Sequence, residues 1–235
     1  QLWGGDEAVE PEVVPHSVSP PAFEPSMAAM PKPAAFWNDR FANEEFVYGE
    51  APNRFVASAA RTWLPEAGEV LLLGAGEGRN AVHLAREGHT VTAVDYAVEG
   101  LRKTERLAAE AGVEVEAIQA DVREWKPART WDAVVVTFLH LPADERPGLY
   151  RLVQRCLRPG GCLVAEWFRP EQRTDGYTSG GPPDPAMMVT ANELRGHFAE
   201  AGIDHLEAAE PTLDEGMHRG PAATVRLVWG RPSTS

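Results

Sequence analysis

The stretch Val70-Leu71-Leu72-Leu73-Gly74-Ala75-Gly76-Glu77-Gly78-Arg79-Asn80 decides the fold of this chain. Its first four residues are apolar, which predicts a short strand buried on both faces. The three glycines allow a tight turn and a close approach of the backbone to a ligand. Residues 79–86 then have helical periodicity and end before Gly88. A strand, a glycine turn and a helix in this order are typical of a doubly wound sheet.

The segments around this stretch alternate between strand and helix patterns. Helices are expected at 54–63, with Asn53 as the cap, and at 79–86, 98–111, 146–157 and 190–201, with Thr190 as the cap. Strands are expected at 70–73, 90–95, 113–119, 131–138, 162–168, 204–210 and 222–229, with Pro159-Gly160-Gly161 turning the chain into the fifth. This order predicts an α/β fold: a doubly wound, mostly parallel, seven-stranded, Rossmann-like sheet whose last strand is antiparallel.

The chain divides into a tail and one domain. Residues 1–33 are rich in proline and acidic residues and lack periodicity, which predicts a flexible N-terminal tail. Ordered structure is expected from the aromatic segment Phe36-Trp37-Asn38-Asp39-Arg40-Phe41, so the domain comprises residues 34–235. A domain of this length is normal for an α/β fold.

Charge and cysteine content narrow the function classes. The net charge of −13 argues against nucleic acid as the main partner, because phosphate binding needs a basic surface. Cys156 and Cys162 are expected to be small buried hydrophobic residues. No apolar run is long enough to span a membrane and no signal peptide opens the sequence, although the chain starts with Gln1 rather than Met. We therefore expect a cytoplasmic protein with no membrane partner.

Two acidic residues follow later strands of the predicted sheet. Asp95 ends the second strand, nineteen residues after Gly76, where a carboxylate can accept hydrogen bonds from both hydroxyls of a ribose. Asp121 follows the third strand, within reach of an adenine amino group. The glycine spacing G-x-G-x-G differs from both the dinucleotide fingerprint and the P-loop. Together, the glycine loop and the two acids predict a site for a nucleoside-containing cofactor.

These three elements resemble those of the class I S-adenosylmethionine-dependent methyltransferases. The resemblance implies S-adenosylmethionine as the cofactor and S-adenosylhomocysteine as the product. In that family the glycine loop faces the methionine part, the acid after the second strand holds the ribose and the later Asp holds the adenine. The cofactor residues expected from the resemblance and from the strand ends are Gly74, Ala75, Gly76, Gly78, Asn80, Asp95, Tyr96, Asp121, Val122, Thr137 and Phe138.

The segment from Phe36 through Tyr48-Gly49 to Pro52-Asn53 is similar to the tellurite-resistance and thiopurine methyltransferase branch of this family. Leu157-Arg158-Pro159-Gly160-Gly161 is similar to that branch too. The resemblance implies a small-molecule acceptor with a soft nucleophile, such as a thiol, a selenium species or a tellurium species. Such a nucleophile needs little help from a base, whereas a hydroxyl or an amine needs one.

The candidate catalytic residues are His140, His218 and Arg219. His140 follows the fourth strand in Phe138-Leu139-His140-Leu141-Pro142, a position that faces the acceptor in the family; alternatively, it only anchors the loop. His218 and Arg219 lie between the last two predicted strands and can bind an anion or orient a nucleophile, or else form an exposed turn.

The N-terminal segment is expected to close over the cofactor. Arg40 and Tyr48 can cover the methionine carboxylate, and Trp37 either joins them or packs in the helix. Glu166 and Asp184 are too isolated to predict a metal site, so we expect none.

Three alternatives remain from the sequence. The first is a nucleotide-dependent oxidoreductase on a Rossmann sheet, which the glycine spacing disfavours. The second is a cofactor-binding module without catalysis, since an intact binding motif does not prove turnover. The third is a methyltransferase that acts on a natural product or on a protein.

Overall fold

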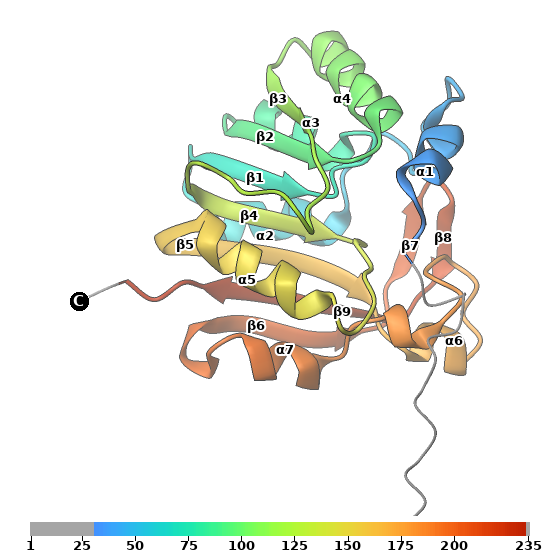
Figure 1. Cartoon of the computed structure of the whole chain (residues 1–235), viewed down its shortest axis with the longest axis vertical. Coiled ribbons are helices and arrows are strands. Elements are labelled where there is room, and N and C mark those ends of the chain that lie inside the picture. The colour runs from blue at the N-terminus through green and yellow to red at the C-terminus, as the bar shows by residue number, and fades with distance from the viewer. Residues whose placement is uncertain (1–30, 234–235) are drawn as a thin grey trace, which may run out of the picture.

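The computed structural model describes residues 31–233 and consists of a central sheet with helices on both faces (Figure 1). Its strands are β1 (Glu69–Leu73), β2 (Thr90–Asp95), β3 (Val115–Gln119), β4 (Trp131–Thr137), β5 (Leu157–Phe168), β6 (Ile203–Ala209), β7 (Thr212–Glu215), β8 (His218–Pro221) and β9 (Thr224–Gly230). Its α-helices are α1 (Ala34–Phe41), α2 (Arg54–Trp63), α3 (Arg79–Arg86), α4 (Val98–Ala111), α5 (Arg146–Cys156), α6 (Glu171–Thr174) and α7 (Ala191–His197). Two short 3-10 helices are η2 (Pro185–Met187) and η3 (Glu200–Gly202).

The central sheet has seven strands in the order β3-β2-β1-β4-β5-β9-β6. β1, β2, β3, β4 and β5 pair in parallel, and β9 runs antiparallel to both β5 and β6. The prediction of a doubly wound, mostly parallel sheet with an antiparallel last strand is confirmed. The strand order reverses between β1 and β4, and such a switch point is where open α/β sheets bind ligands.

Alternate residues of the central strands supply two separate cores. Leu71 and Leu73 of β1 face α5 and α7, whereas Val70 and Leu72 face α2 and α3. A smaller cluster joins α3 to α4. Because both faces are covered, the middle strands are apolar throughout, as the sequence indicates. Both cysteines are buried and free, as expected.

Several boundaries differ from the sequence predictions. The helix expected at 190–201 has its predicted Thr190 cap but ends at His197, because Phe198 takes an extended backbone and packs into the core. The strand expected from Cys162 starts at Leu157, which pairs with Trp131 before a bulge restores the register at Cys162. The helix before it therefore ends at Cys156.

The hairpin of β7 and β8 was not predicted. It forms a separate two-stranded sheet in which Thr212–Glu215 pairs with His218–Pro221. Figure 1 shows this hairpin, α1 and α6 together at one edge of the central sheet. They enclose the carboxyl ends of the parallel strands, where the candidate site lies.

Most of the expected tail, residues 1–30 of 1–33, lies outside the described residues. The last three residues of that tail are described, and Pro31 and Lys32 line the cavity discussed below. Tyr96 donates a hydrogen bond of 2.6 Å to the carbonyl oxygen of Lys32. The division into a tail of residues 1–33 and a domain of residues 34–235 stays a prediction. Within the described part of the chain, no helix has the length and apolar character needed to span a membrane.

Candidate active site

A cavity of about 500 Å³ lies at the carboxyl ends of β1, β2 and β4. This volume is within the range of about 300–1,000 Å³ that is typical of small-molecule sites. Fifteen of the seventeen site residues expected from the sequence line it, namely Trp37, Arg40, Tyr48, Gly74, Ala75, Gly76, Asn80, Asp95, Tyr96, Asp121, Val122, Thr137, Phe138, His140 and His218. Gly78 and Arg219 do not.

The glycine loop turns directly beneath the cavity. Gly74 and Gly76 have φ angles of +69° and +57°, which residues other than glycine rarely adopt. The loop is tied to β2, because the N–H groups of Gly74 and Ala75 both donate to the carbonyl oxygen of Val94. A ligand can therefore approach the backbone of residues 74–76 closely.

Gly78 has a structural role instead of a cofactor contact. It is the N-cap of α3 with a φ of +88°, and a Cβ there would lie 2.6 Å from Oγ1 of Thr104 on α4. This glycine allows α3 to begin close against α4. We therefore correct its assignment: the third glycine of the motif serves helix packing.

Asp95 is a buried carboxylate at the end of β2. Its Oδ2 accepts from Gly76 N at 2.8 Å and its Oδ1 accepts from Ala97 N at 2.8 Å. Burial raises the pKa of Asp95, and the backbone hydrogen bonds partly oppose this shift. Each carboxylate oxygen retains a lone pair, so the group can still accept hydrogen bonds from two hydroxyls.

Asp121 lies at the same end of the cavity but is engaged by a neighbour. Arg123 binds it through Nη2 at 2.5 Å and through its backbone N–H at 2.9 Å, and this pairing lowers the pKa of Asp121. Tyr96 lies beside it, and burial, followed by the charge of Asp95, raises the pKa of Tyr96 to about 12. This end therefore combines the ionised Asp121 with a neutral phenol.

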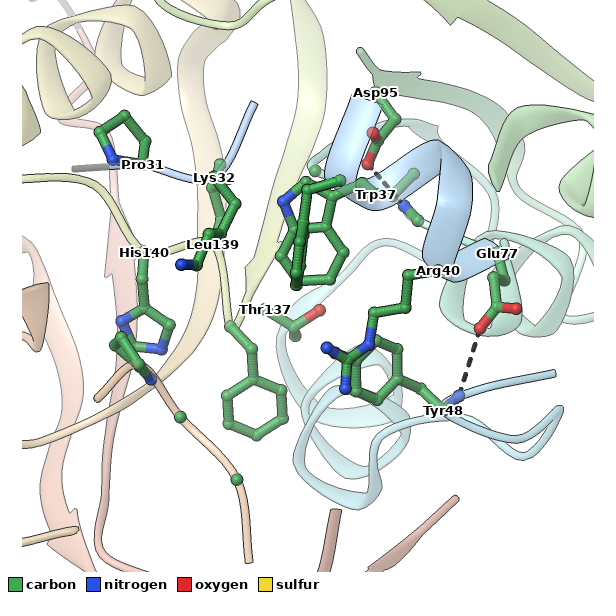
Figure 2. Close-up of a pocket in the computed structure, with 18 of the residues that line it drawn as sticks. Pro31, Lys32, Trp37, Arg40, Tyr48, Glu77, Asp95, Thr137, Leu139 and His140 are labelled. Atoms are coloured by element: carbon green, nitrogen blue, oxygen red, sulfur yellow. Dashed lines mark hydrogen bonds between the residues drawn. The ribbon is translucent and has the colours of Figure 1, made fainter. Parts of the chain in front are cut away.

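The N-terminal wall comes from α1 and the loop after it. Figure 2 shows Trp37, Arg40 and Tyr48 on the side of the pocket that lies across from His140. The guanidinium of Arg40 lies 5.8 Å from the ring of Trp37 and 5.9 Å from that of Tyr48. Among the described residues it forms no ion pair, and its buried Nε has no hydrogen-bond partner. Its Nη2 donates to Sδ of Met217 at 3.2 Å, so this half-buried cation has no anionic partner among the described residues, which suits an anionic ligand group.

The opposite end of the cavity is aromatic. Phe138 follows β4 with a φ of +52°, a strained conformation for a bulky residue, and its N–H donates to the carbonyl oxygen of Glu166 at 2.8 Å. Its ring stacks on Phe168 at 4.6 Å and meets the edge of His218 at 4.9 Å. Thr137 is held by Asn80, which donates to its Oγ1 at 3.0 Å.

His140 has a defined tautomer. Its Nδ1 lies 3.2 Å from the carbonyl oxygen of Met187, and a carbonyl only accepts hydrogen bonds, so Nδ1 carries the proton. Nε2 therefore carries a lone pair, and this buried atom has no hydrogen-bond partner in the part of the chain that the structure describes. Burial lowers the pKa of His140 to about 4, so the ring is neutral at neutral pH. The histidine is anchored to a loop and also presents a free hydrogen-bond acceptor.

The side chains of His218 and Arg219, which are neighbours on β8, lie on opposite faces of that strand. His218 is buried against Tyr48, Phe138 and Phe168, and no described residue forms a hydrogen bond with its Nδ1. Burial, followed by the charge of Arg79, lowers the pKa of His218 to about 3. Arg219 points the other way, with 76% of its side chain exposed and an ion pair to Asp214. The expected His-Arg pair is therefore wrong: only His218 faces the cavity, because alternate residues of a strand lie on opposite faces.

Several lining residues were not predicted from the sequence. Phe168 ends β5, Met187 and Gly180 belong to the loop before α7, and Met217 lies at the tip of the β7–β8 hairpin. The sequence signal available for this loop was the pair Gly180-Gly181, because glycine is used where the backbone approaches another group closely. In the structure, a Cβ at residue 180 would lie 2.5 Å from the ring of His218. Within residues 31–233, no cluster of three or more His, Cys, Asp or Glu side chains is suited to hold a metal ion.

Part of the chain is similar in sequence to known methyltransferases. Residues 70–161 match the family described as a methyltransferase domain. The ubiquinone biosynthesis O-methyltransferase of Salmonella newport is 35% identical over 96 residues, which span 40% of this chain and 39% of that protein. The matched segment thus covers well under half of the curated relative.

Solved structures share the fold over most of the chain. TehB from Haemophilus influenzae has a TM-score of 0.63 at 17% identity, and the aligned region covers 85% of this chain and 67% of the TehB chain. A SAM-dependent methyltransferase from Methanosarcina mazei has a TM-score of 0.62 at 18% identity and covers 78% of this chain and 100% of its own.

Proposed function

We propose that this chain, which contains a SAM-dependent methyltransferase domain, transfers a methyl group from S-adenosylmethionine to a small-molecule acceptor bound beside His140. The observation that carries the proposal is the difference between the two ends of one cavity. Its first end has the glycine turn, Asp95 and Arg40, which has no acidic partner among the described residues, and its second end has a lone pair on a neutral imidazole.

The residues at the first end fit the cofactor. The glycine turn at 74–76 leaves room for the methionine part, and Arg40 can bind its carboxylate. Asp95 can hold the ribose hydroxyls, and Asp121 with Val122 can face the adenine. When bound, S-adenosylmethionine supplies an electrophilic methyl group on a sulfonium ion. The protein then has to align the acceptor and exclude water.

The second end determines the acceptor chemistry. His140 and His218 are both neutral, so neither supplies positive charge to bind an anion at neutral pH. Nε2 of His140 accepts a hydrogen bond, which selects an acceptor that has an X–H group. During transfer the X–CH₃ bond would form as the bond between the methyl carbon and the sulfonium sulfur breaks, which releases S-adenosylhomocysteine, and the proton of the X–H bond would pass to Nε2 of His140.

We propose a soft nucleophile, such as a thiol or a selenium or tellurium species, as the acceptor atom. An imidazole with a pKa of about 4 is a weak base, because burial disfavours its charged form. It removes a proton poorly from a hydroxyl group, whereas a soft nucleophile attacks with little assistance. The likeness to TehB is one of fold and is compatible with this choice.

A hydroxyl acceptor is the second candidate, favoured by the fixed tautomer of His140 and by the O-methyltransferase relative. Thiophenol and phenol distinguish the two, because they share one ring. With S-adenosylmethionine present, we expect kcat/KM for thiophenol to exceed that for phenol by at least about a hundredfold, the lower end of what a well-matched base contributes. Equal values, or a preference for phenol, would reject the soft nucleophile. Formation of S-adenosylhomocysteine with neither acceptor, nor with a wider panel of thiols and phenols, would reject a small-molecule acceptor.

A further inference from the structure

The β7–β8 hairpin brings one histidine to the cavity and one carboxylate to the glycine loop. Glu215 and His218 are directly paired across the hairpin, so their side chains lie on the same face. Both are buried, with 4% and 8% of their surfaces exposed. The neighbouring pair, Asp214 and Arg219, lies on the opposite, exposed face.

Glu215 connects this hairpin to the start of α3. Its Oε2 lies 2.7 Å from Nη1 of Arg79, the first residue of α3 after the glycine loop. Nδ2 of Asn53 donates to Oε1 of Glu215 at 3.3 Å and to Oε2 of the buried Glu166 at 2.7 Å. Arg79 also donates to the carbonyl oxygen of Tyr48 at 3.3 Å. The carboxylate of Glu215 is thus fixed by groups from α2 and α3.

The turn of the hairpin is held by the backbone as well. Met217 N–H donates to the carbonyl oxygen of Val47 at 2.9 Å. Gly216 has a φ of +61°, and a Cβ there would lie 2.4 Å from that same oxygen. Glu77 of the glycine loop in turn accepts from Val47 N and Tyr48 N at 3.1 and 3.2 Å. The glycine loop, the segment 47–49 and the hairpin therefore form one connected unit.

The ring of His218 depends on this unit for its place. Its buried Nδ1 makes no hydrogen bond within residues 31–233, so the ring is located by its backbone and by contacts with Tyr48 and Phe138 at 4.6 and 4.9 Å. We propose that Glu215 is a positioning residue for the methyl acceptor: it holds the hairpin so that His218 forms the acceptor wall. This inference rests on the proposed function, because it assumes that the acceptor lies against His218.

Glu215→Gln tests the proposal, because the amide retains the shape of Glu215 and removes the charge that pairs with Arg79. We expect KM for the acceptor to rise at least about tenfold, since displacement of a substrate contact by about 1 Å can cost a hundredfold. The affinity for S-adenosylhomocysteine, measured by calorimetry, should stay unchanged, as should kcat at saturating acceptor. Asp214→Asn on the exposed face of the same hairpin is the matched control and should leave all three values unchanged.

Gly216→Ala is an independent variant that displaces the hairpin without removing a charge. It should reproduce the rise in KM, which keeps the test available if Glu215→Gln does not fold. An unchanged KM in a folded variant would overturn the proposal, and so would a parallel loss of S-adenosylhomocysteine affinity, which would show that the unit serves the cofactor loop. If the wild-type protein methylates no small molecule, the proposed function fails. If the wild-type protein does methylate a small molecule and neither variant changes KM for it, the proposed function stands and this inference alone fails.

Discussion

Gly76 and Asp95, nineteen residues apart, are joined by a hydrogen bond of 2.8 Å from the backbone N–H of the glycine to Oδ2 of the acid. The bond fixes the glycine turn after β1 against the carboxyl end of β2. The two halves of the expected cofactor site are thus a single rigid feature, and the acid contributes both to the loop conformation and to the polarity of the cavity.

Asp95→Ala should weaken binding of S-adenosylhomocysteine by more than about tenfold. The change removes the acceptors for two ribose hydroxyls, and a hydrogen bond to a charged group is worth about 1.5–3 kcal/mol. Calorimetric titration measures the effect. Glu114→Ala, at an exposed position outside the cavity, serves as the control. Unchanged affinity in Asp95→Ala would show that the ribose lies elsewhere.

Cofactor affinity should also fall at acidic pH. The ionised carboxylate of Asp95 accepts both hydroxyls, and burial raises its pKa above the ordinary value for aspartate. Affinity is therefore full above this raised pKa and is lost as the pH falls through it. Titrations of S-adenosylhomocysteine across the acidic range should show the loss in the wild type and not in Asp95→Asn. The same pH dependence in both proteins would assign it to another group.

Arg40→Gln should separate the two parts of the cofactor. Because Arg40 has no acidic partner in the described part of the chain, we assign it to the methionine carboxylate. The variant should bind S-adenosylhomocysteine about tenfold more weakly, as expected for a lost hydrogen bond to a charged group of about 1.5 kcal/mol. Methylthioadenosine, which lacks the amino-acid part, should bind both proteins equally. Equal losses for the two ligands would contradict the assignment.

His140→Ala should lower turnover and leave cofactor affinity unchanged. With a thiol acceptor we expect a loss below about a hundredfold, the low end of general-base contributions, since the nucleophile is already reactive. At saturating S-adenosylmethionine, the wild-type rate should stay level as the pH falls below 6 and decline only near the pKa of about 4, where the ring becomes protonated. A decline centred on the ordinary histidine pKa, or no loss in His140→Ala, would remove His140 from the reaction.

The parallel sheet was predictable because most of its buried strands have an apolar run and several of the turns contain a glycine. The cofactor end was predictable for a related reason: Asp95 and Asp121 follow strands whose carboxyl ends meet at one edge. These features are local in sequence and need no knowledge of packing.

The acceptor end depends on long-range packing and was predicted only in part. Thr212–Glu215 and His218–Pro221 contain too few apolar residues for a strand pattern, so the hairpin was missed. Without a strand there, nothing in the sequence separates His218 from Arg219. Gly78 shows the same limit, because its contact with Thr104 on a neighbouring helix cannot be read from the motif.

The most direct test of the account is calorimetric titration of the purified chain with S-adenosylmethionine and S-adenosylhomocysteine, with NAD titrated in parallel. The account predicts micromolar binding of the methyl donor and of its product, and no binding of NAD. Failure to bind either sulfur compound, or tighter binding of NAD, would contradict the assignment of the cavity to methyl transfer.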